Sequence, residues 1–254
     1  MAKAAQTAGL VDRVGDSTSF ANRVAELAGE DSDPRSTGFA TLDLDAYVKA
    51  KAPANKGEIG VLTVSGEIID GEGGGGIAAG DSIAALLRRA LAEQDLKALV
   101  VRVDSPGGSV LASEKIRSAI MEAKAQGLPV VASMGNVAAS GGYWISTPAD
   151  RILAEPSTIT GSIGVFGILP SFEGALAKIG ITTDGIRTTP LSGEPNVLGG
   201  VSPEFNKVAQ LGVEDMYRRF VGLVARSRHL STGRVDSIAQ GRVWDGGTAR
   251  QLKL

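Results

Sequence analysis

The sequence predicts an α/β fold with a mostly parallel sheet and flanking helices. Segments rich in β-branched residues alternate along the chain with segments of helical periodicity, which is typical of this class. One segment, Ala98–Val103 (ALVVRV), is nearly continuous in apolar residues, as expected for a parallel strand that is covered on both faces. With 254 residues, the chain is long enough for one large domain and a small appendage.

The first 57 residues are predicted to form a leader and linker, followed by a main domain over 58–254. In the leader, Phe20, Val24 and Leu27 have helical spacing, and a second short segment covers 42–48. Polar or Pro/Gly-containing linkers are expected at 29–38 and at 52–57.

The main domain is predicted to begin with a strand at 59–68, followed after a glycine-rich loop by a helix carrying Leu87 and Leu91, which Asp81 or Ser82 caps. The elements predicted next are a helix at 110–126 ended by Gly127, a strand at 129–134, a turn at 135–142, a helix from 141 to 146, a strand at 151–155, an extended segment at 160–167, a helix at 172–179, a strand at 181–188, a helix at 203–228 with Ser202 as cap, and a helix at 234–240.

Composition excludes several functional classes. The net charge is −2 and the basic residues are scattered, which disfavours nucleic-acid binding. The absence of cysteine excludes disulfides and thiolate chemistry, and one histidine among dispersed carboxylates predicts no metal site and no cofactor. Because no apolar run is long enough to cross a bilayer, we expect the chain itself to be soluble.

Ser140 is the strongest candidate nucleophile among six serines in or beside glycine-rich turns. The others are Ser105, Ser109, Ser133, Ser146 and Ser162. Ser140 follows a predicted buried strand and precedes Gly141 at a helix start, as in a nucleophile elbow. The helix dipole would then act on the reaction centre, and the amide of Gly141 would be available to an oxyanion.

A second turn, SPGGS at 105–109, follows the neighbouring predicted strand. Because ligands bind beyond the carboxyl ends of parallel strands, Gly107 and Gly108 are predicted to bring their amides beside Ser140. Each turn alone is more simply a tight connection. Together they indicate an oxyanion hole for acyl transfer.

No base is evident from the sequence. His229 stands near a helix end among arginines and is interpreted as a solvated residue rather than a triad member. A neutral lysine is the alternative. However, the candidate lysines are all predicted to be exposed, namely Lys97, Lys115, Lys124, Lys178 and Lys207.

Several blocks in order resemble protease IV, also called signal peptide peptidase A. They are SPGGS at 105–109, GNVAASGGYWIST at 135–147, PSTITGSIGVFG at 156–167 and QGRVWDG at 240–246. The resemblance implies a fold like that of Clp protease and crotonase, and a serine endopeptidase that degrades cleaved signal peptides with a serine–lysine dyad.

The resemblance also implies roles for single residues. Ser140 matches the nucleophile, Gly108 and Gly141 match oxyanion positions, and Ser162 matches the serine that hydrogen-bonds the lysine. Read on its own, Ser162 is equally a turn serine that caps its own backbone.

Short members of the family carry their lysine in a segment corresponding to 188–201, which contains no lysine here. In long tandem members the lysine comes from the N-terminal half. This chain therefore resembles the C-terminal half, and its leader resembles the tail of a missing upstream repeat. The resemblance implies little activity for the chain alone, a homo-oligomer, and a parent protein on the periplasmic face of the bacterial inner membrane.

Two other functions remain open. The chain could be a non-catalytic scaffold half of a tandem enzyme, although two amide-rich turns at one crevice argue against that. It could also be a crotonase-like enzyme of acyl-CoA thioesters, which would use the oxyanion hole without a nucleophilic serine.

Overall fold

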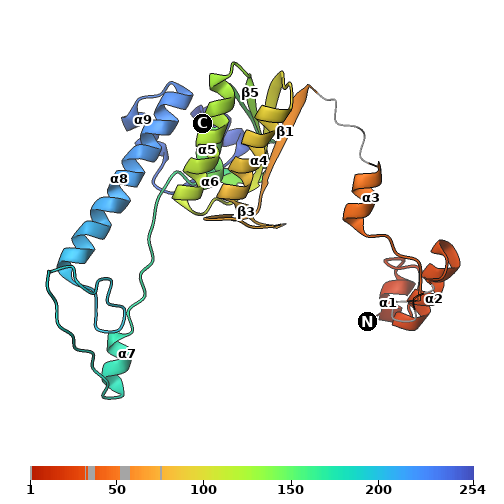
Figure 1. Cartoon of the computed structure of the whole chain (residues 1–254), viewed down its shortest axis with the longest axis horizontal. Coiled ribbons are helices and arrows are strands. Elements are labelled where there is room, and N and C mark those ends of the chain that lie inside the picture. Colours follow the sequence, from red (N-terminus) through yellow and green to blue (C-terminus); the bar gives the residue numbers. More distant parts are fainter. Residues whose placement is uncertain (1, 32, 34–37, 52–57, 75) are drawn as a thin grey trace. The chain divides into compact units, whose positions relative to one another are not determined.

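The computed structural model describes residues 2–31, 33, 38–51, 58–74 and 76–254. It divides the chain into two compact units, Met1–Lys56 and Gly57–Leu254 (Figure 1). The linker expected at 52–57 lies outside the described residues, as does half of the one expected at 29–38.

The described part of the first unit is helical, as predicted. Its helices are α1 (Ala2–Thr7), α2 (Ser17–Ala28) and α3 (Leu44–Lys51). Helix α2 begins after Asp16, whose carboxylate accepts a hydrogen bond from the amide of Ser19 at 2.8 Å.

The second unit is built around a mostly parallel sheet. Among the described residues this sheet has six strands, in the order β1 (Ile59–Ser65), β4 (Ala98–Ser105), β5 (Val130–Ala139), β7 (Ile159–Gly161) and β8 (Val243–Asp245), with β6 (Arg151–Leu153) also paired to β5. Only the pairing of β7 with β8 is antiparallel in this sheet. The predicted α/β class with a mostly parallel sheet is confirmed.

Two helices pack side by side against this sheet, α4 (Gly80–Glu93) and α5 (Val110–Ala125) (Figure 1). The predicted cap of α4 is wrong. Its N-cap is Ala79, because the short strand β3 (Ala78–Ala79), paired with β2 (Ile68–Ile69), leads directly into the helix. Asp81 therefore lies inside the first turn, where its charge favours the helix dipole.

Strand β5 is longer than predicted and includes most of the expected turn at 135–142. Its register with β4 shifts between Val103 and Ser105, so that Ser105 pairs with Ala138. The carboxylate of Asp104 occupies the irregularity and accepts a hydrogen bond from the amide of Val137 at 3.1 Å. The sequence did not show this because the stabilising group comes from the neighbouring strand.

The strand predicted at 181–188 is wrong. This segment follows α7 (Glu173–Lys178) without regular structure, and its side chains are exposed; Ile186 is 99% exposed. β-branched residues favour a strand only when another strand is available for pairing. The next prediction is confirmed, because α8 (Pro203–Arg228) starts with Pro203 and the Ser202 hydroxyl accepts from the amide of Phe205.

Two elements near the end were not predicted, β8 and α10 (Gly246–Leu252); the helix expected at 234–240 is α9 (Thr232–Ile238). Helix α10 ends as α1 does. The amide of Leu254 bonds to the carbonyl of Ala249, and that of Leu10 to the carbonyl of Ala5, each at 2.9 Å. The residue before each leucine has positive φ, 66° at Lys253 and 70° for the glycine at position 9.

The helix that begins at Ser140 is anchored through Trp144. Helix α6 (Gly141–Ser146) is buried throughout, and the Trp144 ring packs against Phe220 of α8 with centroids 4.8 Å apart. The indole N–H donates to Glu114 of α5 at 2.8 Å. Burial by itself would raise the pKa of Glu114, but hydrogen bonds from Arg117 and Trp144 outweigh it and hold this pKa below its usual value.

This depressed pKa predicts a pH-dependent contribution to stability. A carboxylate with a lower pKa in the folded state stabilises that state above its unfolded pKa, about 4.3, and the contribution disappears as the pH falls through the folded pKa. Replacing Glu114 by glutamine should therefore lower the free energy of unfolding near pH 7 and have a shrinking effect toward pH 3. Urea unfolding of both proteins across this range tests it. A difference independent of pH would contradict it.

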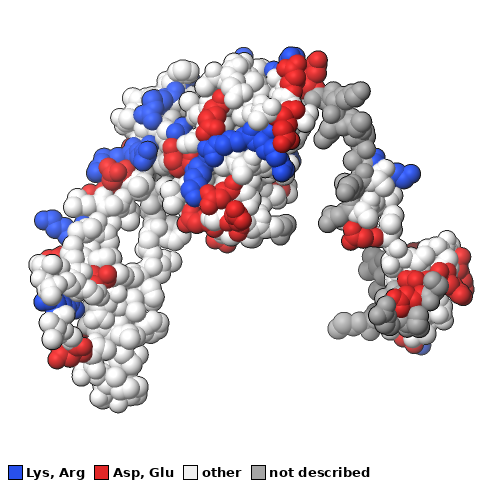
Figure 2. Space-filling view, viewed as in Figure 1, with Lys and Arg blue, Asp and Glu red and all other residues white. Residues whose placement is uncertain are grey.

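Figure 2 shows basic side chains over α4 and α5 flanked by acidic ones, and among them Arg88 pairs with Glu122 at 2.7 Å. None of the described helices is long and apolar enough to cross a membrane.

Candidate active site

Ser140 lies in the bend between β5 and α6, in a backbone conformation that is unusual for serine. Its φ is 50° and its ψ −118°, and positive φ is costly for a residue with a side chain. The bend is held at both ends: the Ser140 amide donates to the carbonyl of Gly161, and its carbonyl accepts from the amide of Trp144, each at 2.9 Å. The hydroxyl does not cap α6, and Ser140 lines an open pocket instead.

The turn after β4 is fixed by strand β2. Ile68 donates to the carbonyl of Gly107 and accepts from the amide of Ser109, each at 2.8 Å, so that Ile68 and Gly108 form a parallel bridge. In such a bridge the N–H and C=O of the intervening residue point away from the partner strand. The amide of Gly108 is therefore directed away from Ile68.

The two turns are in close contact. A Cβ atom on Gly107 would lie 2.5 Å from the nitrogen of Gly141, and one on Gly141 would lie 3.3 Å from the nitrogen of Gly108. Within the described residues, neither the Gly108 amide nor the Gly141 amide donates to any acceptor. The structure thus brings together Ser140 and the three glycines predicted from the sequence, with two unpaired donors beside the serine.

Ser162 shares the pocket with Ser140. The pocket has a volume of about 580 Å³ and is also lined by Glu67, Val165 and Phe166. Ser162 follows β7 with φ 47°, and its amide donates to the carbonyl of Arg242 at 2.8 Å.

An adjoining pocket of about 460 Å³ joins both serines to Tyr217 and Gln240. The hydroxyl of Tyr217 donates a hydrogen bond to the carboxylate of Asp236 at 2.6 Å. Burial and this carboxylate together raise the pKa of Tyr217 to about 12.

Sequence reasoning missed three of these lining residues. Glu67 and Tyr217 lie far from the recognised blocks, and Tyr217 is one residue of a long amphipathic helix, which gives no signal of a site. Gln240 opens a block that was recognised, so its position in the sequence could have suggested it.

None of the basic residues considered reaches the two serines. His229 is exposed at the C-cap of α8 and lines neither pocket. Lys115 and Lys124 were predicted to be exposed, but both are half-buried because they pair with Asp81 and Asp150 across neighbouring elements. Within the described ranges no lysine lines either serine pocket, and no cluster of histidine and carboxylate side chains could hold a metal ion.

The fold is that of the Clp proteases. A ClpP1 mutant from Listeria monocytogenes superposes with a TM-score of 0.51 over 76% of this chain and 86% of that one, at 14% identity.

The sequence comparisons then give the family. Residues 122–254 match the model of peptidase family S49, and the chain belongs to this family. Protease 4 of Salmonella typhi is 48% identical over 201 residues, which are 79% of this chain and 32% of that protein. Protease 4 of Haemophilus influenzae is 40% identical over 255 residues, 98% of this chain and 41% of that protein. The chloroplastic serine protease SPPA of Arabidopsis thaliana is 36% identical over 162 residues, 62% of this chain and 23% of that protein. The chain thus spans less than half the length of these relatives.

Proposed function

We propose that this chain is the nucleophile-bearing part of a serine endopeptidase, with Ser140 as the attacking residue. The observation that carries the proposal is the contact between the two turns, which leaves the amides of Gly108 and Gly141 unpaired beside Ser140. In the reaction, the Ser140 oxygen attacks a peptide carbonyl and its proton passes to a base. The two amides stabilise the resulting oxyanion, and one such donor contributes about 3 kcal/mol to catalysis.

The base is proposed to be a lysine supplied by a different part of a longer protein. Two observations support this: no lysine in the described part of the chain lines the serine pockets, and the relatives named Protease 4 are two to three times longer than the aligned region. Ser162 lines both pockets with Ser140, and its hydroxyl would accept a hydrogen bond from the neutral amino group of the incoming lysine.

The leader is proposed to be the tail of an upstream copy of the same domain. Its support is the shared helix end, in which Leu10 and Leu254 make the same hydrogen bond after a residue of positive φ. A tandem protein of this kind would bring a second domain, and with it the lysine, to Ser140.

The proposed substrates are cleaved signal peptides, with the full protein acting on the periplasmic face of the bacterial inner membrane. Apolar side chains at the pocket support an apolar peptide as substrate: Val165 lines it and Phe166, 83% exposed, lies at its rim.

A homo-oligomer is also proposed. The segment between β7 and α8 exposes several large apolar side chains, including Ile168, Phe172, Ile179 and Ile186. Neighbouring copies would shield such a surface from water.

The proposal predicts very low peptidase activity for this chain alone. Loss of general acid–base catalysis lowers a rate by about 100-fold to 10,000-fold. Turnover of a peptide ester should therefore be close to background, and Ser140→Ala should lower it little further. Rapid turnover that disappears in Ser140→Ala would show that a base within this chain acts. Turnover of an acyl-CoA thioester that persists in Ser140→Ala would favour a crotonase-like enzyme instead.

A further inference from the structure

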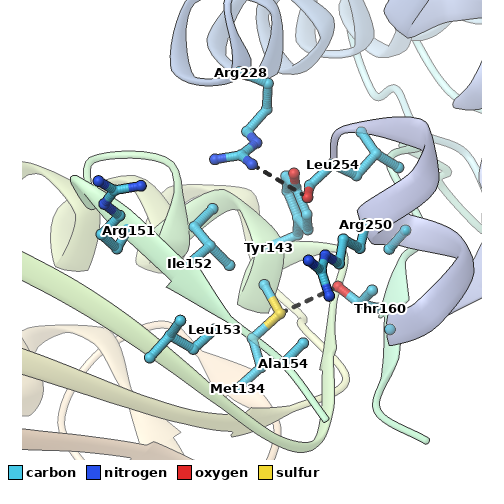
Figure 3. Close-up of a pocket in the computed structure, with 12 residues that line it drawn as sticks. Met134, Tyr143, Arg151, Ile152, Leu153, Ala154, Thr160, Arg228, Arg250 and Leu254 are labelled. Atoms are coloured by element: carbon cyan, nitrogen blue, oxygen red, sulfur yellow. Dashed lines mark hydrogen bonds between the residues drawn. The ribbon is translucent and has the colours of Figure 1, made fainter. Parts of the chain in front are cut away.

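A pocket on another part of the domain has the features of a binding site for an anion. It has a volume of about 470 Å³ and lies among β6, α6, α10 and the end of α8 (Figure 3). It shares no lining residue with the pockets at Ser140. Three arginines line it, Arg151, Arg228 and Arg250, and no aspartate or glutamate does.

Tyr143 contributes a hydrogen-bond donor without a partner. Its side chain is 1% exposed, and within the described residues its hydroxyl makes no hydrogen bond. Burial raises its pKa well above the usual value, so the hydroxyl stays protonated and can donate. A buried hydroxyl without a partner destabilises the fold, which favours a bound group that accepts its proton.

The arginines differ in their engagement. Arg228 donates to the main-chain oxygens of Lys253 at 3.1 Å and Leu254 at 3.4 Å. The guanidinium groups of Arg151 and Arg250 make no hydrogen bond or ion pair with any described residue. Figure 3 shows the three guanidinium groups around the space that Tyr143 lines. Two guanidinium groups are thus available to a ligand, and their planar donors suit a carboxylate.

The remaining wall favours a peptide over a small free acid. Met134, Ile152 and Leu153 give the pocket an apolar side, which a hydrophobic side chain next to the carboxylate would cover. The chain contains a segment with this chemistry. After the helix end at Leu10, which matches the helix end at Leu254 beside this pocket, the sequence continues as Val11 and Asp12.

We propose that this pocket binds an extended acidic peptide segment of the Leu-Val-Asp type, whose carboxylate accepts hydrogen bonds from Arg151, Arg250 and the Tyr143 hydroxyl. This role is independent of catalysis at Ser140. The pocket would bind a peptide and hold it to this domain, and it would not cleave the peptide.

The test uses a fluorescent peptide of the sequence Leu-Val-Asp-Arg-Val, capped at both ends, and fluorescence anisotropy. The host is the full chain carrying Asp12→Asn, so that its own segment cannot compete. Hydrogen bonds between charged groups change binding by about tenfold or more, so a peptide with asparagine in place of aspartate should bind at least ~10-fold more weakly. Sodium acetate, as a free carboxylate, should displace the peptide only at far higher concentration.

Variants of the chain assign the contacts. Arg151→Gln, Arg250→Gln and Tyr143→Phe should each weaken peptide binding several-fold, and Tyr143→Phe should leave the melting temperature unchanged or raised because it removes an unpaired hydroxyl. Arg226→Gln is the matched control, since Arg226 is exposed on α8 and does not line the pocket. The proposal fails if the peptide does not saturate the chain at millimolar concentration, if the three variants bind like the control, or if acetate binds as tightly as the peptide.

Discussion

A small primary amine should restore Ser140-dependent ester hydrolysis to this chain. The reason is geometric: the serine pockets, about 580 and 460 Å³, contain Ser140 and Ser162 but no described lysine. Methylamine carries the reactive end of a lysine and is small enough to enter. In its neutral form it can accept the Ser140 proton while the amides of Gly108 and Gly141 stabilise the oxyanion. We expect at least a ~10-fold increase, part of the 100-fold to 10,000-fold that a base typically supplies.

The measurement is the hydrolysis rate of a peptide ester against amine concentration at several pH values. Only the neutral amine is a base, so the stimulated rate should rise with pH toward the pKa of a primary amine, about 10. A tertiary amine of similar basicity and larger volume should stimulate much less. Ser162→Ala should reduce the stimulation, because Ser162 is proposed to position the amine.

Ser140→Ala separates rescue from direct attack of the amine on the ester. In that variant the amine-dependent rate should fall to the rate measured without protein. If the amine accelerates both proteins equally, Ser140 is not the nucleophile. If the unmodified chain needs no amine, a base within the chain already acts.

The parts of the fold that the sequence predicted are those set by local pattern. The apolar strand at Ala98, the glycine that ends α5, and Ser202 with Pro203 at the start of α8 each depend on residues close in sequence. These signals express backbone propensity and capping, which need no knowledge of the tertiary structure.

The errors occur where a distant partner decides the outcome. Strand β5 continues through an expected turn because Asp104 of β4 binds the amide of Val137. The segment at 181–188 has strand-like composition but no strand beside it, so it stays irregular. Ala79 caps α4 because β2 pairs with β3. Pairing of this kind is not encoded in any short stretch of sequence.

The candidate site divides in the same way. Ser140 and its glycines were predicted because each turn is a short block of serine and glycine that follows a strand. The parallel sheet then places the two turns at one edge. Tyr217 was missed because tertiary packing, such as that of Phe220 on Trp144, brings α8 to the site, and no local sequence pattern shows such packing. The base was not predicted because none of the described lysines of this chain lines the pockets at Ser140.

Replacing Gly107 by alanine should disrupt the site by forcing its two turns apart. The added Cβ would lie 2.5 Å from the nitrogen of Gly141, 2.8 Å from the Cβ of Ser140 and 2.9 Å from the carbonyl oxygen of Ala139. All three belong to the bend at the start of α6 and cannot rotate away. Relief requires the two turns to separate, which would move the Gly108 amide away from Ser140.

Two effects should follow from the separation. Loss of one oxyanion donor lowers a rate by about 100-fold or more, so Gly107→Ala should abolish the amine-stimulated hydrolysis. Stability should fall as well, by about 1–2 kcal/mol for a side chain at positive φ and about 1–3 kcal/mol for overpacking. Gly107 has a φ of 101°, so both costs apply.

Gly127→Ala is the matched control, because it introduces the backbone strain of a positive φ without the steric contact. Gly127 has a similar φ of 88°, at the end of α5, but a Cβ there would meet nothing within 4 Å. This variant should lose only the positive-φ contribution to the free energy of unfolding and keep the amine-stimulated rate. Equal losses in both variants would mean that strain rather than contact is responsible, and the inferred proximity of the two turns would then have no bearing on reaction at Ser140.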